Sequence, residues 1–179
     1  TRRSGRRSRG WPMAGGDTRL ACGHCWARVR KLPAPHCDRC GHPRTRDACD
    51  WCALLPPYVR AARSHCWIPG GTGGAIVHAF KYSGWKALAA EMGAMMARLP
   101  WPADVIAERS ALVPLPLAAS RERERGYNQS AELARAIGAI WQLPVWEDVV
   151  ERSRATETQT GLTPEERRSN VSDAFRVRA

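Results

Sequence analysis

Six of the seven cysteines in this chain stand in three Cys-x-x-Cys pairs between residues 22 and 52. Two intervening residues let both sulfurs of a pair reach one ion from a tight turn, and two such pairs complete a tetrahedral four-thiolate zinc site. Structural zinc contributes about 10–16 kcal/mol of apparent binding free energy in zinc-finger peptides, which can replace a missing hydrophobic core. We therefore predict a structural zinc site, with ligands drawn from Cys22, Cys25, Cys37, Cys40, Cys49 and Cys52.

Six thiolates are enough for one complete zinc site and half of a second one. The preferred complete set is that of the second and third pairs. Gly41 directly after Cys40 suits a tight turn around a metal-bound sulfur. The alternative set joins the first pair to the second. Nearby histidines offer further ligands, although a single histidine is more often an ordinary surface residue; they are His24, His36, His42 and His65.

Disulfides and redox chemistry are the competing interpretations of the cysteine pairs. The first residues are basic but lack the apolar stretch of a secretory signal, so a cytoplasmic location is the default, and disulfides are rare there. Thioredoxin-like chemistry needs a strand–helix frame around a pair, and no such frame surrounds these. Cys66 stands outside the pattern and is expected to be buried as a small apolar residue.

The charge of the chain is strongly positive but unevenly distributed. The formal net charge is +11, and residues 1–60 carry 13 Lys and Arg against 4 Asp and Glu. Bound zinc would change this sum, because four thiolates around Zn²⁺ carry a net negative charge. The remainder of the chain is close to neutral, so the high isoelectric point is weak evidence for a nucleic-acid-binding face. No apolar run approaches the roughly 18 residues of a transmembrane helix, so no membrane span is expected.

The composition divides the chain into three parts. Residues 1–20 are rich in Arg, Gly and Ser and are expected to be disordered, whereas residues 21–57 form the predicted zinc ribbon. Residues 58–179 alternate helix-like and strand-like segments, which predicts an α/β domain with a mostly parallel sheet. Helices are expected at 74–82, 85–99 and 128–141 and after a capping box at Thr163, and strands at 111–117 and 145–152.

Arginine-rich segments in the second half are the candidates for ligand binding. Residues 113–129 read VPLPLAASRERERGYNQ, a strand-like run broken by prolines and followed by arginines and a helix start. Such a segment would present cations at the carboxyl end of a sheet, where open α/β sheets bind their ligands. Arginine forks suit phosphate or pyrophosphate groups.

The order of these motifs resembles that of the ComF family of bacterial competence-type proteins. Cys-x-x-Cys pairs are followed by Phe-Lys-Tyr, by V-P-x-P-L with R-x-R-G-Y-N-Q, by R-x-R-x-T-x-x-Q-x-x-L and by R-x-x-N-V-x-x-A-F, over residues 21–179. The resemblance implies a zinc ribbon followed by a type I phosphoribosyltransferase-like domain. It also implies a ligand similar to phosphoribosyl pyrophosphate, bound with Mg²⁺, and the transferase chemistry of glycosyl transfer.

The resemblance assigns the segment 114–129 to a pyrophosphate-side loop and 152–170 to a mobile loop over the substrate. The binding residues it implies are Arg121, Arg125, Gly126, Tyr127, Asn128 and Gln129, followed by Lys81, Arg152, Arg154, Thr156, Gln159, Arg167 and Asn170. Structural roles compete with these assignments. The arginines of the first segment are also compatible with a solvated face, and Asn128 with a helix cap.

The chain departs from the family pattern at both ends. The family's acidic D-D-x-x-T-T-G loop, which holds the ribose and 5-phosphate, is expected just beyond Val177, and the chain contains no Asp-Asp pair. The first cysteine pair of a double ribbon is also missing, and the Arg-rich leader stands in its place. We therefore expect a fragment that is inactive by itself.

Two classes of function are consistent with these observations. The first is a phosphoribosyltransferase-type protein linked to DNA uptake and natural transformation. The second is a binding module or scaffold for single-stranded DNA, for a competence helicase or for other uptake proteins. In the second hypothesis Trp26 and Trp51, which lie beside the cysteine pairs, would stack on bases.

Overall fold

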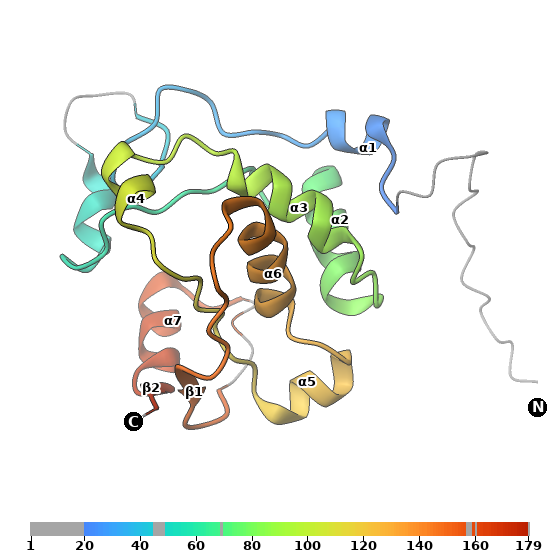
Figure 1. Cartoon of the computed structure of the whole chain (residues 1–179), viewed down its shortest axis with the longest axis vertical. Helices are drawn as coiled ribbons and strands as arrows, with labels where there is room; N and C mark the ends of the chain where they lie inside the picture. The colour runs from blue at the N-terminus through green and yellow to red at the C-terminus, as the bar shows by residue number, and fades with distance from the viewer. Residues whose placement is uncertain (1–19, 45–48, 69, 157–158, 160, 179) are drawn as a thin grey trace, which may run out of the picture.

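The computed structural model describes residues 20–44, 49–68, 70–156, 159 and 161–178. Nearly all of the leader that is expected to be disordered lies outside these residues. The described chain is mainly helical, with a small two-stranded sheet near its C-terminus (Figure 1). No helix among the described residues has both the length and the apolar character needed to cross a membrane.

Three helices form the body of the molecule: α2 (Gly71–Tyr82), α3 (Leu88–Ala97) and α6 (Gln129–Trp141). Helix α3 packs along α6, as Figure 1 shows, and the backbones approach closely at Gly93. A Cβ atom added at Gly93 would lie 2.6 Å from the Cβ of Ala136, so this crossing requires glycine. Phe80 and Leu88 are each only 1% exposed and anchor the core between α2 and α3.

The helix boundaries follow local sequence signals. The expected helix at 128–141 is confirmed as α6, and the Asn128 side chain accepts a hydrogen bond of 2.9 Å from the Ser130 N–H at its start. The expected capping box is also confirmed. Thr163 accepts from the Glu166 N–H while the Glu166 carboxylate accepts from the Thr163 N–H, and helix α7 (Pro164–Val171) follows.

The sheet differs from the prediction of a mostly parallel one. Strands β1 (Val150–Arg152) and β2 (Phe175–Val177) pair in antiparallel orientation. Residues 111–117, expected as a strand, pair with residues 144–146 only around a single parallel bridge between Leu112 and Val145. Proline supplies no N–H to a ladder, so Pro114 and Pro116 prevent this segment from continuing as a regular strand.

The remaining elements surround this body. The short helices α1 (Gly23–Ala27), α4 (Ala103–Glu108) and α5 (Ala119–Arg125) flank it, and the 3₁₀ helix η1 (Asp50–Leu54) belongs to the cysteine-rich part. Ala21 and Val29, on either side of α1, join the core that contains Phe80. The residues around the first cysteine pair therefore pack on the helical body. The predicted domain boundary at residue 57 stays a prediction.

Candidate metal centre and basic pocket

Four cysteine sulfurs converge at the cysteine-rich end of the molecule. The Sγ atoms of the second and third pairs all lie within 4.8 Å of one another. Cys37 and Cys52 are 3.3 Å apart and Cys40 and Cys49 are 3.4 Å apart. Tetrahedral zinc with Zn–S bonds of about 2.3 Å separates its sulfurs by about 3.8 Å, so the set fits a four-thiolate metal site.

This geometry selects one of the two ligand sets considered from the sequence. The preferred set, formed by the second and third pairs, is the one brought together, whereas Cys22 and Cys25 of the alternative set do not join this cluster. Cys22 and Cys25 lie 3.5 Å from each other at helix α1, which is far from η1 in Figure 1. Packing of Ala21 and Val29 into the core holds this pair on the helical body.

The turn that carries Cys37 and Cys40 is held by backbone geometry. Gly41 has a φ of +67°, and a Cβ atom there would lie 2.5 Å from the carbonyl oxygen of Ala62. The Gly41 N–H donates to the Cys37 carbonyl at 2.9 Å, which closes the turn. The glycine is therefore needed both for the left-handed conformation and for close approach of residues 62–63.

Arg39 connects this turn to the segment after η1. Its guanidinium group donates to three carbonyl groups, those of Leu55 at 3.2 Å, Pro56 at 2.9 Å and Val59 at 3.3 Å. This role was not predictable from the sequence, because nothing in the spacing of one arginine indicates a long-range partner. The His42 ring packs on the Trp51 ring, with the two ring centroids 4.4 Å apart, so an aromatic contact also joins the cysteine turn to η1.

The protein also prepares one sulfur for metal binding. Backbone N–H groups, first that of Cys40 and then that of Arg39, lower the pKa of Cys37 to about 6. The hydrogen bond with Cys37 is the first cause that raises the pKa of Cys52, to about 12. Without an ion, Cys37 is thus the first of this pair to become a thiolate, and a metal would draw the others into that state.

A second site lies where α2 and α5 end. Three of the binding residues implied by the resemblance line a pocket of about 530 Å³: Arg121 and Arg125 on α5, and Lys81 on α2. Its other lining residues are Tyr82, Gly84 and Glu124, so three cations face one carboxylate. The Arg125 guanidinium lies 5.2 Å from the centre of the Tyr82 ring, which orients it at the pocket.

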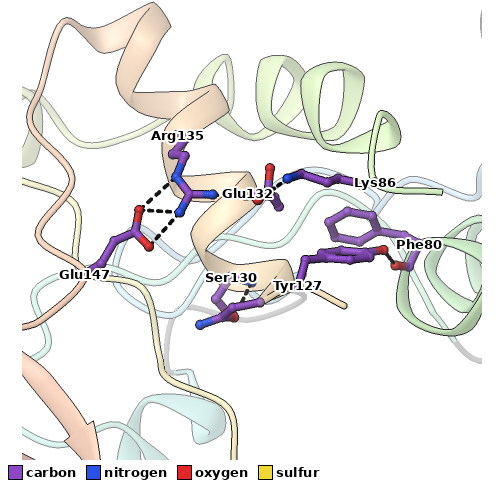
Figure 2. A network of polar contacts seen from close by, with 8 residues as sticks. Phe80, Lys86, Tyr127, Ser130, Glu132, Arg135 and Glu147 are labelled. Carbon is purple, nitrogen blue, oxygen red and sulfur yellow. Dashed lines mark hydrogen bonds and ion pairs between the residues drawn. The ribbon is translucent and has the colours of Figure 1, made fainter. Parts of the chain in front are cut away.

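The core sets the distance between these two helix ends (Figure 2). Tyr127 is buried directly after α5, and its hydroxyl donates to the Phe80 carbonyl oxygen near the end of α2. Burial raises the pKa of this hydroxyl. Lys86 and Glu132, 3.0 Å apart, connect the loop after α2 to α6. Tyr127, named from the resemblance as a binding residue, thus sits in the core and positions the cations on either side.

Other predicted binding residues gather around β1. Arg152 donates to the Thr156 hydroxyl, and Arg154 donates to the Asn170 carbonyl at 3.1 Å. Burial, followed by the nearby guanidinium groups of Arg121 and Arg154, lowers the pKa of Arg152. Arg121 therefore acts electrostatically on the β1 arginines while it lines the basic pocket. Arg152 and Arg154 also line a cavity of about 630 Å³ that contains acidic side chains.

Most of the remaining predicted binding residues end helices or form hydrogen bonds within the protein. Gly126 ends α5 with a φ of +83°, which favours glycine. The Asn128 amide donates to the Leu115 carbonyl at 3.1 Å in addition to capping α6, and Gln129 accepts from Arg125. The Gln159 carbonyl accepts from the Leu162 N–H at 3.4 Å. Arg167 is exposed on α7, and no side-chain contact joins it to the basic pocket among the described residues.

Comparison with curated proteins finds relatives over most of the chain. Competence protein F of Haemophilus influenzae is 26% identical over 163 residues, which are 86% of this chain and 62% of that protein. DNA utilization protein YhgH of Salmonella typhi is 30% identical over 167 residues, 87% of this chain and 70% of that protein. YhgH of Escherichia coli K12 is 29% identical over 175 residues, 88% of this chain and 74% of that protein.

No family model matches the chain, and no solved structure matches it. The chain spans less than two thirds of the Haemophilus protein and somewhat more of the two YhgH proteins. On the strength of these relatives, the chain belongs to the ComF family.

Proposed function

We propose that this chain binds a phosphorylated sugar of the phosphoribosyl pyrophosphate type in the pocket formed by Lys81, Arg121 and Arg125, and that it serves DNA uptake and utilisation. The observation that carries the proposal is the convergence of these three cations on one cavity. Planar guanidinium groups bind phosphate oxygens through paired, charge-assisted hydrogen bonds, which gives both affinity and orientation.

The electrostatic balance around α5 supports an anionic ligand. Among the described residues, Glu124 is the only carboxylate that lines the pocket, and the pKa of Arg152 is lowered in part by Arg121. Like charges held close together without an equal number of carboxylates are stabilised when an anion binds between them. A pyrophosphate group carries several negative charges and would therefore stabilise these cations when it binds between them.

A phosphoribosyltransferase-like fold for residues 58–179 is part of the proposal, and the ComF motifs support it. The parallel bridge between Leu112 and Val145, with α6 between the two segments, is compatible with one strand–helix–strand unit of such a fold. The role in DNA uptake rests on the names of the relatives, Competence protein F and DNA utilization protein YhgH.

The residues at the basic pocket do not form a resident magnesium site. Mg²⁺ prefers oxygen ligands such as carboxylates, and the lining supplies one carboxylate beside three cations. We therefore assign no step to Mg²⁺ held by these side chains. The Mg²⁺ ion that the resemblance predicts would have to enter the pocket already bound to the phosphate groups of the ligand.

The test is a calorimetric titration of the chain with phosphoribosyl pyrophosphate. Arg121→Gln should weaken binding at least tenfold, since it removes a cation from the pocket. Arg123→Gln is the matched control, because Arg123 lies exposed on the same helix and is not part of the pocket lining. Equal affinity of the two variants, or no binding to the unsubstituted chain, would contradict the proposal.

A second candidate function is contact with single-stranded DNA at the zinc ribbon. Trp51 is 52% exposed beside the cysteine cluster and packs on His42, so its ring is available for base stacking. Trp51→Ala should lower affinity for a short thymidine oligonucleotide several-fold in fluorescence anisotropy. Val177→Ala, at another exposed apolar residue, serves as the control. An unchanged affinity in Trp51→Ala would remove this candidate.

A further inference from the structure

A separate basic cavity lies between the cysteine cluster and the helical body. It has a volume of about 350 Å³ and is lined from the cluster side by His36 and Gly41. The connecting segments contribute Lys31, Arg63 and His65, and the end of α3 contributes Arg98. No residue of the basic pocket at α5 lines this cavity, so it is a different site.

The charge of this cavity is positive. Among the described residues, its lining contains three permanent cations and two histidines but no Asp or Glu. Within the described part of the chain, neither Lys31 nor Arg98 forms an ion pair with a carboxylate. Arg63 is fixed by hydrogen bonds of 2.8 Å to the carbonyl groups of Pro100 and Ala62, so it is already oriented. An anion would meet the oriented guanidinium group of Arg63 beside Lys31 and Arg98, without having to displace a carboxylate from the described residues.

An apolar chamber of about 220 Å³ adjoins the basic cavity. The two share Arg63, Ser64, His65 and Met95, and the chamber is otherwise lined by groups such as Trp26, Val77 and Met92. Two buried ring nitrogens at this chamber, Trp26 Nε1 and His65 Nδ1, have no hydrogen-bond partner among the described residues. Buried polar atoms are nearly always paired, so these two indicate a missing polar partner at an apolar surface.

We propose that the two cavities together bind a nucleotide, with its phosphate on Lys31, Arg63 and Arg98 and its base in the apolar chamber. Cations beside a chamber of Met and Trp side chains match a ligand with an anionic end and a flat, largely apolar end. The same chemistry is offered by a free nucleotide and by one unit of a single strand. This inference is independent of the sugar-phosphate site at α5.

The metal centre forms part of the wall of this site. Gly41 follows the ligand Cys40, and its close approach to the Ala62 carbonyl brings the cysteine turn against Arg63. Loss of the metal would release the turn that carries His36 and Gly41. Nucleotide affinity in the basic cavity should therefore depend on zinc, although none of its proposed contacts is a metal ligand.

The experiment measures binding of thymidine 5′-monophosphate, inorganic phosphate and a twelve-residue thymidine oligonucleotide to the zinc-loaded chain. The test variant is Lys31→Gln with Arg98→Gln. The control is Arg123→Gln with Arg168→Gln, which removes two exposed arginines that line none of the described cavities named above. Lys31→Arg with Arg98→Lys keeps both charges and should keep binding. Circular dichroism verifies that each variant retains its helices.

We expect the test variant to lose at least tenfold in affinity for the mononucleotide or for the oligonucleotide, while the control changes less than twofold. Loss confined to the mononucleotide identifies a free nucleotide as the ligand, and loss confined to the oligonucleotide identifies a strand. The ligand that shows the loss should also bind at least tenfold more tightly than inorganic phosphate. Equal losses in test and control variants, or affinities for the mononucleotide and the oligonucleotide that are no higher than the affinity for phosphate, would overturn the inference.

Discussion

The cysteine-rich segment and the helical body are organised by different forces. In the helical body, Phe80 and Leu88 are almost fully buried and α3 crosses α6 without space for a side chain at Gly93. In the segment from His36 to Val59, Cys37 and Gly41 are the only buried residues among those described. Its contacts are made by sulfurs, by hydrogen bonds to backbone carbonyl groups and by the packing of His42 on Trp51. A segment of this kind depends on a metal, whereas the body depends on apolar burial.

The difference explains why the functional candidates lie at the edges of both regions. The basic pocket at α5 uses helix ends whose spacing is fixed by Tyr127 and Phe80 in the core. The basic cavity beside the cysteine turn is lined by His36 and Gly41, which are fixed only if the turn is fixed. The first site should therefore respond to changes in the core and the second to loss of the metal.

The largest effect is expected from breaking the metal centre. Cys52→Ser should abolish stoichiometric zinc binding and remove most of the apparent free energy, about 10–16 kcal/mol, that structural zinc contributes in small domains. Hydrogen exchange should become fast at residues 36–44 and 49–59 and stay slow in α3 and α6. Cys22→Ser is the matched control, since Cys22 lies outside the cluster, and it should retain zinc. Equal zinc loss in both variants would refute the ligand set.

Breaking the apolar core should have the next largest effect. Phe80→Ala is expected to lower the free energy of unfolding of the helical body by about 3–5 kcal/mol, because it leaves a cavity at a side chain that is 1% exposed. Zinc content should be unchanged. Ile106→Ala, at a side chain that is 45% exposed, should cost about 0.5 kcal/mol or less in the same denaturant titration. Similar losses at both positions would contradict the assignment of the core.

A smaller effect is expected at the crossing of α3 and α6. Gly93→Ala places a methyl group 2.6 Å from the Ala136 Cβ and should cost about 1–3 kcal/mol in thermal unfolding. In α1, a Cβ atom at Gly23 meets no atom within 4 Å, so Gly23→Ala should be neutral or slightly stabilising. Equal stability of the two variants would show that the helices do not cross at Gly93.

The smallest effect concerns acid stability at the two-stranded sheet. Hydrogen bonds from Arg178 and then Arg176 lower the pKa of Glu151 below its usual 4.5. The folded pKa lies below the unfolded value, so the stabilisation is present above about pH 4.5 and is lost as the pH falls through the folded pKa. Glu151→Gln should thus lower the unfolding midpoint slightly at pH 7 and not at pH 2. If the unfolding midpoints of the variant and the unsubstituted chain differ more at pH 2 than at pH 7, the predicted pH dependence is wrong.

The sequence predicted the features that depend on local spacing. The helix at 128–141, its Asn128 cap and the capping box at Thr163 depend on residues within one turn of each other. A four-thiolate cluster also followed from the short Cys-x-x-Cys spacing, and its members are the set that was preferred from the sequence.

Long-range features were harder to predict. The parallel sheet expected around 111–117 is reduced to one bridge, because Pro114 and Pro116 interrupt the hydrogen-bond ladder. The carbonyl partners of Arg39 and the meeting of Lys81 with Arg121 arise from packing between distant segments. No spacing rule relates residues so far apart in the sequence. The family resemblance nevertheless named both Lys81 and Arg121 as binding residues.

X-ray absorption at the zinc edge, with metal content measured on the same sample, tests the central claim most directly. The account predicts one zinc per chain with four sulfur neighbours at about 2.3 Å, retained in Cys22→Ser and lost in Cys52→Ser. A first shell containing nitrogen or oxygen, or a zinc that survives Cys52→Ser with its sulfurs intact, would contradict it.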